Sequence, residues 1–129
     1  MKNILIQTGA IAALAFLAES SASAASFTIS TPQTSAETLG PGAGQTGTIT
    51  DTGSLTVSGG TNAVTITGNN ATLTNLGALE QTGTGRAIRD NTGVTGLTVT
   101  NGSSTNSTAV MQTADGDVIQ MNKSPPASP

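Results

Sequence analysis

The sequence predicts an all-β protein folded as a right-handed parallel β-helix, a solenoid of about three to four coils. Residues 81–91 form a motif that recurs at residues 112–122 with Gln, Thr, Gly, Ile and Asn in the same places. Short apolar–Thr–apolar triplets also alternate with turn clusters rich in Gly and Asn. The composition, finally, favours pleated strands and sharp turns over helices.

The composition restricts the classes of protein to which the chain can belong. Its 129 residues give room for one domain, and they include 24 Thr, 16 Gly, only two Phe, and no Trp, Tyr, His or Cys. A charged fraction of 9% argues against ordinary disorder, and scarce aromatic side chains argue against a compact globule. The net charge of −3 gives no reason to expect a nucleic-acid partner, and no disulfide can form.

Residues 1–24 have the pattern of a secretory signal peptide, for which we expect a helical segment that is removed. A positive start at Lys2 precedes an apolar run, and Ala22-Ser23-Ala24 offers small residues at a cleavage site before Ala25. The run is shorter than the about 20 residues that span a bilayer. We therefore expect an exported chain that engages the secretion machinery.

Two segments flank the predicted solenoid, which we place at residues 48–122. Residues 25–47 contain Pro and Gly at short intervals, so they are either an N-terminal cap or an irregular leader. Residues 123–129 form a Pro-rich tail that cannot continue a strand ladder, because proline lacks the backbone N–H.

The triplets predict which side chains form the core of the repeats. Alternation with period two places the outer members of each triplet inward and the Thr outward, where the Thr side chains form ladders. The expected inward residues are Leu55, Val57, Val64, Ile66, Leu73, Leu79, Ile88, Leu97, Val99, Val110 and Ile119, of which Leu73, Leu79, Ile88, Val99, Val110 and Ile119 make up the repeat core.

The spacing between repeats predicts one enlarged turn. Leu73-Thr74-Asn75 recurs as Val99-Thr100-Asn101, and this offset is shorter by five than the offset between the two copies of the longer motif. We assign the difference to a bulging loop within Ser103–Ala109, since solenoids accept insertions at their corners.

These features together resemble the N-terminal passenger region of bacterial autotransporters, the proteins of type V secretion. The resemblance rests on the signal pattern, the Gly/Thr/Asn-rich coils, and the segments at residues 71–79 and 81–88. It implies a β-helical passenger located at the cell surface or outside the cell, with host or biofilm surface ligands as partners. Members of this family continue into an outer-membrane β-barrel translocator, of which this sequence shows no alternating strands with aromatic girdles. The chain is therefore interpreted as a truncated passenger, which would remain in the periplasm if it lacks a translocator.

The residue types leave little room for catalysis or metal binding, and we predict no catalytic, cofactor-binding or metal-binding residues. Without His or Cys, a nucleophile–His pair is excluded and a metal site would need oxygen ligands alone. Asp115-Gly116-Asp117 is similar to a calcium-binding turn, but the first motif copy has Thr84-Gly85-Arg86 there, which favours a solvated turn. Arg86 and Arg89 either contact an anionic glycan or keep the surface soluble; the second interpretation is favoured.

The sequence thus predicts a structural or adhesion-type passenger fragment without catalytic activity. Two alternatives stay open: a fragment of a β-helical polysaccharide-active enzyme, and a non-functional truncated gene product. The enzyme would need carboxylates gathered on one face, whereas six acidic residues are scattered from Glu37 to Asp117.

Overall fold

The computed structural model describes residues 26–122, which form twelve strands in three parallel sheets. Sheet A contains β1 (Phe27–Ile29), β4 (Thr46–Ile49), β7 (Thr72–Asn75) and β10 (Thr98–Asn101). Sheet B contains β2 (Pro32–Gln33), β5 (Ser54–Val57), β8 (Ala78–Gln81) and β11 (Val110–Thr113). Sheet C contains β3 (Glu37–Leu39), β6 (Val64–Ile66), β9 (Ile88–Asp90) and β12 (Ile119–Gln120).

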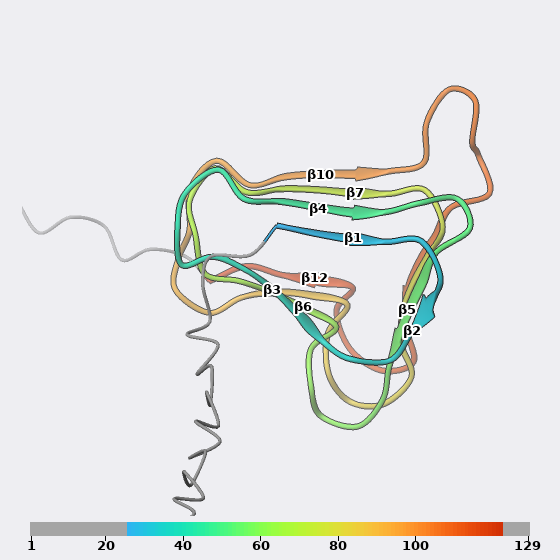
Figure 1. Ribbon diagram of the computed structural model, residues 1–129. Coiled ribbons are helices and arrows are strands. Elements are labelled where there is room, and N and C mark those ends of the chain that lie inside the picture. Colours follow the sequence, from blue (N-terminus) through green and yellow to red (C-terminus); the bar gives the residue numbers. More distant parts are fainter. Residues whose placement is uncertain (1–25, 123–129) are drawn as a thin grey trace, which may run out of the picture.

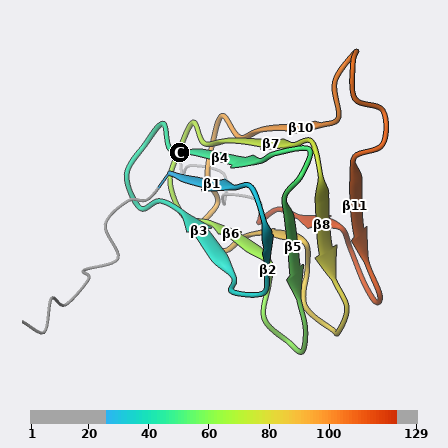
Figure 2. The same ribbon diagram turned by 45° about the vertical axis from the view of Figure 1, so that its right-hand side comes forward.

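The chain passes through sheets A, B and C in turn and does so four times (Figure 1). Each strand therefore pairs with the strand three places along the chain, always in parallel, as β1 does with β4 and β5 with β8. The strands of sheet B lie side by side in Figure 2. This arrangement confirms the predicted parallel β-helix, with four coils.

The first coil corrects the predicted start of the solenoid. Residues 27–39, expected to be a cap or an irregular leader, form β1, β2 and β3, and these strands pair with β4, β5 and β6. Ile29 and Leu39 place buried side chains inside the coil. Pro32 is tolerated because β2 is the edge strand of sheet B, where a missing N–H costs no ladder hydrogen bond.

The core is a set of apolar columns that run through the interior of the coils. Leu73, Leu79 and Ile88 are fully buried, and each contributes about 1.5–3 kcal/mol relative to an exposed position. Val99 lies above Leu73 in the register of β7 and β10, as the recurring triplet predicts. It is only partly buried, because it belongs to the fourth coil. The other expected core residues that are buried are Leu55, Val57, Val64 and Ile66, and Leu97 packs against the core while partly exposed.

Val110 does not belong to the core, contrary to the prediction. β11 pairs with β8 so that Met111 lies above Leu79, while Val110 lies above Ala78 on the outer face and is 40% exposed. The turn from β11 to β12 has five residues, 114–118, and the turn from β8 to β9 has six, 82–87. A shift of one residue moves side chains to the opposite face of a strand, so equal motif spacing misassigned Val110.

Ile119 occupies the predicted column but is not buried. It pairs with Ile88 in the register of β9 and β12, yet its side chain is 42% exposed. Ile88, one coil earlier, is fully buried. The difference arises because no coil stacks beyond β12 within residues 26–122.

Several sequence predictions concern residues outside the described range. They are the signal peptide, its cleavage at Ala22, Ala24 and Ala25, and the Pro-rich tail. Residues 26–122 contain no helix long and apolar enough to cross a lipid bilayer.

Candidate functional site

Two buried amide side chains hold the turns between coils. Asn75 donates from Nδ2 to Oδ1 of Asn101 (2.7 Å) and to the backbone oxygen of Val110 (2.7 Å). Gln81 donates from Nε2 to the backbone oxygens of Gly59 (2.9 Å) and Thr61 (2.7 Å). These contacts join successive coils, so both amides serve the architecture and are not free to bind a ligand.

Asp90 is a buried carboxylate at the end of β9. It accepts hydrogen bonds from the backbone N–H groups of Thr92 (2.8 Å), Gly93 (2.8 Å) and Val94 (3.0 Å). Burial raises the pKa of this carboxyl, but the N–H groups of these residues and of Asn122 outweigh burial and hold the pKa below its usual value. An ionised carboxylate with its oxygens already occupied is a turn-forming group rather than a proton donor.

Sequence reasoning did not single out Asp90, although a signal was present. The run Asp90-Asn91-Thr92-Gly93 follows an apolar strand residue, and aspartate commonly bonds to the backbone two residues on in such turns.

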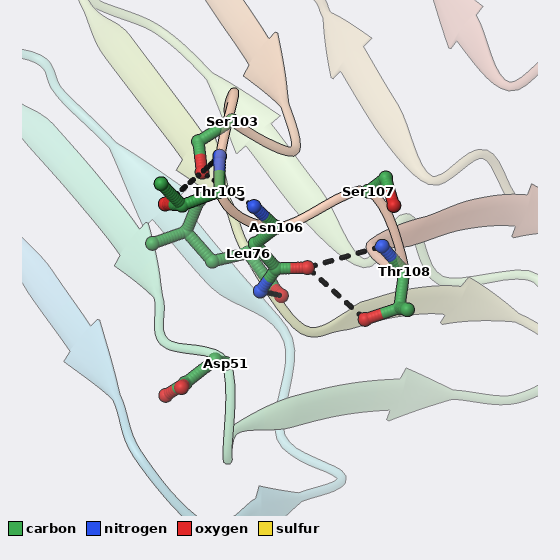
Figure 3. Close-up of a pocket in the computed structure, with 7 residues that line it drawn as sticks. All are labelled: Asp51, Leu76, Ser103, Thr105, Asn106, Ser107 and Thr108. Carbon is green, nitrogen blue, oxygen red and sulfur yellow. Dashed lines mark hydrogen bonds between the residues drawn. The ribbon is translucent and has the colours of Figure 1, made fainter.

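The enlarged turn between β10 and β11 projects from the coil (Figures 1 and 2). Together with the turn after β4 it borders a hollow of about 450 Å³. Asn106 donates to the backbone oxygen of Leu76 (2.7 Å) and accepts from the N–H and hydroxyl of Thr108 (Figure 3). The lining residues are Asp51, Leu76, Ser103, Thr105, Asn106, Ser107 and Thr108.

This hollow is suited to water and small polar solutes rather than to a bound organic ligand. Its amide is engaged within the protein, and the exposed carboxylate of Asp51 lies apart from the loop residues (Figure 3). Leu76 is the one apolar residue in the lining, whereas ligand pockets are predominantly apolar and aromatic.

The turn Asp115-Gly116-Asp117 lies over the guanidinium group of Arg86. Gly116 has φ +86°, and a Cβ added there would lie 3.3 Å from Cζ of Arg86. Arg86 donates from Nη1 to the backbone oxygen of Thr84 (2.9 Å), while its Nε is buried without a partner among the described residues. Both aspartates are exposed. Two carboxylates on one turn fall short of the six to eight oxygen ligands that calcium takes.

No group of three His, Cys, Asp or Glu residues within residues 26–122 lies close enough together to hold a metal ion. Arg89, the second cation considered from the sequence, donates to Asn91 and to Gln120. The structure therefore engages both arginines within the chain, Arg86 through a backbone oxygen and Arg89 through two side chains.

The end of the fourth coil exposes apolar side chains. Ile119 and Met121 are 42% and 43% exposed, and Val99, Met111 and Val118 are partly buried. We call these five residues the end face. Leu73, Leu79 and Ile88, which lie one coil earlier in the same columns as Val99, Met111 and Ile119, are fully buried.

Comparison of the chain with models of protein families, with curated proteins and with solved structures finds no match.

Proposed function

We propose that this chain is a structural segment of a secreted or cell-surface β-helical protein, an autotransporter passenger whose role is display or adhesion rather than catalysis. The observation that carries the proposal is the end face. It presents apolar side chains in register with the buried columns below it, as a coil does when another coil is to stack on it. A stack that extends in this way builds a rod.

The energetics of stacking support a structural role. Full burial of an exposed valine, isoleucine or methionine contributes about 1.5–3 kcal/mol, and a further coil would add the part of this that the partial exposure of the end face leaves unmade, less than half for each side chain. Solenoid stability is close to a sum of coil stabilities and interfaces between neighbours. An added coil that covers the end face should therefore increase the free energy of unfolding.

The charged residues do not favour the alternative of a polysaccharide-active enzyme. Glycosidases use two carboxyl groups about 5–10 Å apart, and the general acid has a raised pKa. Asp90 has the opposite environment, since backbone N–H groups lower its pKa and fill its acceptor positions. Asp115 and Asp117 share one exposed turn with no opposing carboxylate near enough to form a group of three acidic residues among residues 26–122.

The export part of the proposal is tested with the full chain, tagged at its C-terminus and produced in a Gram-negative bacterium. We expect the tagged protein outside the cytoplasm, with an N-terminus at Ala25. A matched variant carrying Ala22→Leu and Ala24→Leu should keep its leader and stay associated with the inner membrane. Full-length wild-type protein found in the cytoplasm would contradict export.

The structural part is tested by adding a coil. A protein with a second copy of residues 91–122 inserted after Asn122 should show a higher urea midpoint than the original chain. The control carries an insertion of the same length made of Gly and Ser. Equal midpoints for the two insertions would show that the end face does not accept a coil.

A further inference from the structure

The outer face of sheet A carries a regular array of threonine side chains. Two outward positions on each strand, separated by one inward residue, are occupied by Thr in β4, β7 and β10, and β1 adds one more. The strand register aligns them in two columns. The columns are Thr28, Thr48, Thr74 and Thr100, and beside them Thr46, Thr72 and Thr98.

The array distinguishes sheet A from the other two sheets. The outer face of sheet B includes Glu80 and Val110, and that of sheet C includes Arg89 and Gln120. The threonine columns contain no charged and no aromatic side chain. Among residues 26–122, none of the seven hydroxyl groups makes a hydrogen bond to a protein atom, so all of them are available to an external partner.

The positions of these hydroxyl groups are fixed by the fold. Neighbouring strands in a sheet lie about 4.7–4.9 Å apart, and alternate residues of a parallel strand are about 6.6 Å apart. Threonine is branched at Cβ and has restricted χ1 rotation. The backbone beneath rests on Ile49 and Leu73, which are fully buried. The four strands run nearly parallel across one side of the coil (Figure 1).

We propose that this threonine face binds the surface of ice. The repeat between its strands is near the shorter repeat of the oxygen atoms on the prism face of hexagonal ice, so ordered waters on the hydroxyl groups can join the lattice. Ice is an uncharged lattice of hydrogen-bond donors and acceptors, and it therefore suits an array of uncharged hydroxyl groups. The threonine methyl groups lie between the hydroxyls and favour the release of less ordered water.

A soluble ligand fits this face less well. Small-molecule sites are concave and lined with aromatic and apolar side chains, whereas the threonine face is a sheet surface without aromatic side chains. The same lack of aromatic side chains disfavours crystalline polysaccharide, because aromatic rings supply the large rigid apolar surfaces on which flat sugar rings stack. Ice binding goes beyond the proposed structural role and does not depend on it, because the folded chain presents the threonine face whether or not it is exported.

Ice-affinity partitioning of the purified full chain tests the proposal. Ice is grown slowly in a dilute solution, and the protein in the ice and in the remaining liquid is measured. We expect several-fold enrichment in ice over a non-binding protein of similar size, together with inhibition of ice recrystallisation. Thr74→Tyr, at the centre of the array, should abolish both effects. Thr65→Tyr, which makes the same change on the outer face of sheet C, should leave both effects intact.

Circular dichroism and urea midpoints establish that each variant is folded. If Thr74→Tyr fails to fold, Thr100→Tyr on the edge strand β10 replaces it, because this exposed side chain has a neighbouring strand on one side only. Exclusion of the wild-type chain from ice overturns the proposal, as does equal partitioning of the Thr74 and Thr65 variants. Binding to crystalline cellulose that Thr74→Tyr abolishes, without partitioning into ice, would assign the face to a polysaccharide lattice instead.

Discussion

Replacing Asp90 tests whether one buried carboxylate holds the turn between the third and fourth coils. Asp90 is fully buried and accepts three backbone N–H bonds of 2.8, 2.8 and 3.0 Å. A hydrogen bond to a charged group contributes about 1.5–3 kcal/mol. Thr92, Gly93 and Val94 keep some exposure, so water can satisfy part of what Asp90→Ala leaves unpaired. We therefore expect a loss of about 2–4 kcal/mol, discounted from the full sum of three bonds.

Asp90→Asn tests the contribution of the negative charge, because asparagine keeps the shape of the aspartate side chain and is neutral. The amide oxygen can still accept from Thr92 and Gly93, but the amide nitrogen then faces the N–H of Val94. The expected loss at neutral pH is about 1–2 kcal/mol, since one charged acceptor becomes a donor. Either loss is a large fraction of the about 5–15 kcal/mol by which native proteins are stable.

The pH dependence follows from the direction of the pKa shift. The folded pKa of Asp90 is lowered from its ordinary value of 3.8. Its stabilisation is therefore complete above the unfolded pKa and is lost as the pH falls through the lower folded pKa. The stability difference between wild type and Asp90→Asn should shrink across this acid range.

The assay is urea unfolding followed by far-ultraviolet circular dichroism, because the chain has no Trp or Tyr for fluorescence. Asp51→Asn is the matched control: Asp51 is exposed and makes no hydrogen bond within the described residues, so a change within about 0.5 kcal/mol is expected. Equal losses for the Asp51 and Asp90 variants at neutral pH would refute the assigned role of Asp90.

Three further predictions address the register, the coil spacing and the first coil. Met111→Asp should cost more than about 1 kcal/mol, because it places a charge at a partly buried position against the core. Val110→Asp, on the exposed outer face, should cost less than about 1 kcal/mol. The reverse order in urea unfolding would restore the register expected from the motif alone. Gly77→Ala should cost more than about 2 kcal/mol, because the added Cβ would overlap a backbone oxygen of the preceding coil. The control Gly60→Ala should change stability by less than about 0.5 kcal/mol, because its Cβ would meet only Oγ1 of Thr84, at an ordinary contact distance of 3.7 Å. Burial raises the pKa of Glu37, so ionisation of this carboxyl disfavours folding as the pH rises above the unfolded pKa of 4.5. Glu37→Gln should therefore raise the urea midpoint at neutral pH and lose that advantage near pH 4. A midpoint that is unchanged at both pH values would contradict this.

The parts of the fold that depend on local pattern were predictable from the sequence. The recurrence of Leu73-Thr74-Asn75 as Val99-Thr100-Asn101 is the register of β7 and β10, and the expected insertion within Ser103–Ala109 lies in the projecting turn. Both follow from alternation with period two and from turn chemistry, which act over a few residues. The first coil was assigned to a cap or an irregular leader because Pro and Gly recur at short intervals between residues 32 and 44, although Phe27-Thr28-Ile29 matches the apolar–Thr–apolar triplet and forms β1.

The threonine face was not predicted from the sequence, although the sequence contains every threonine that forms it. Outward threonine ladders were expected from every triplet, but the sequence repeat assigned only Leu73-Thr74-Asn75 and Val99-Thr100-Asn101 to the same sheet. The sequence offset between paired strands grows along sheet B, from the pair β2 and β5 to the pair β8 and β11, while in sheet A it is equal for the last two pairs. One offset relates Thr48, Thr74 and Thr100, but Thr28 pairs with Thr48 at a shorter offset, so no single period aligns the whole array. The strand pairing extends the column of Thr48, Thr74 and Thr100 to Thr28, while Thr56 in sheet B lies beneath Glu80. The array is therefore a property of the coil stacking. A one-residue change in a single turn, as between β11 and β12, can move the threonine side chains of a strand to its opposite face and so interrupt both columns.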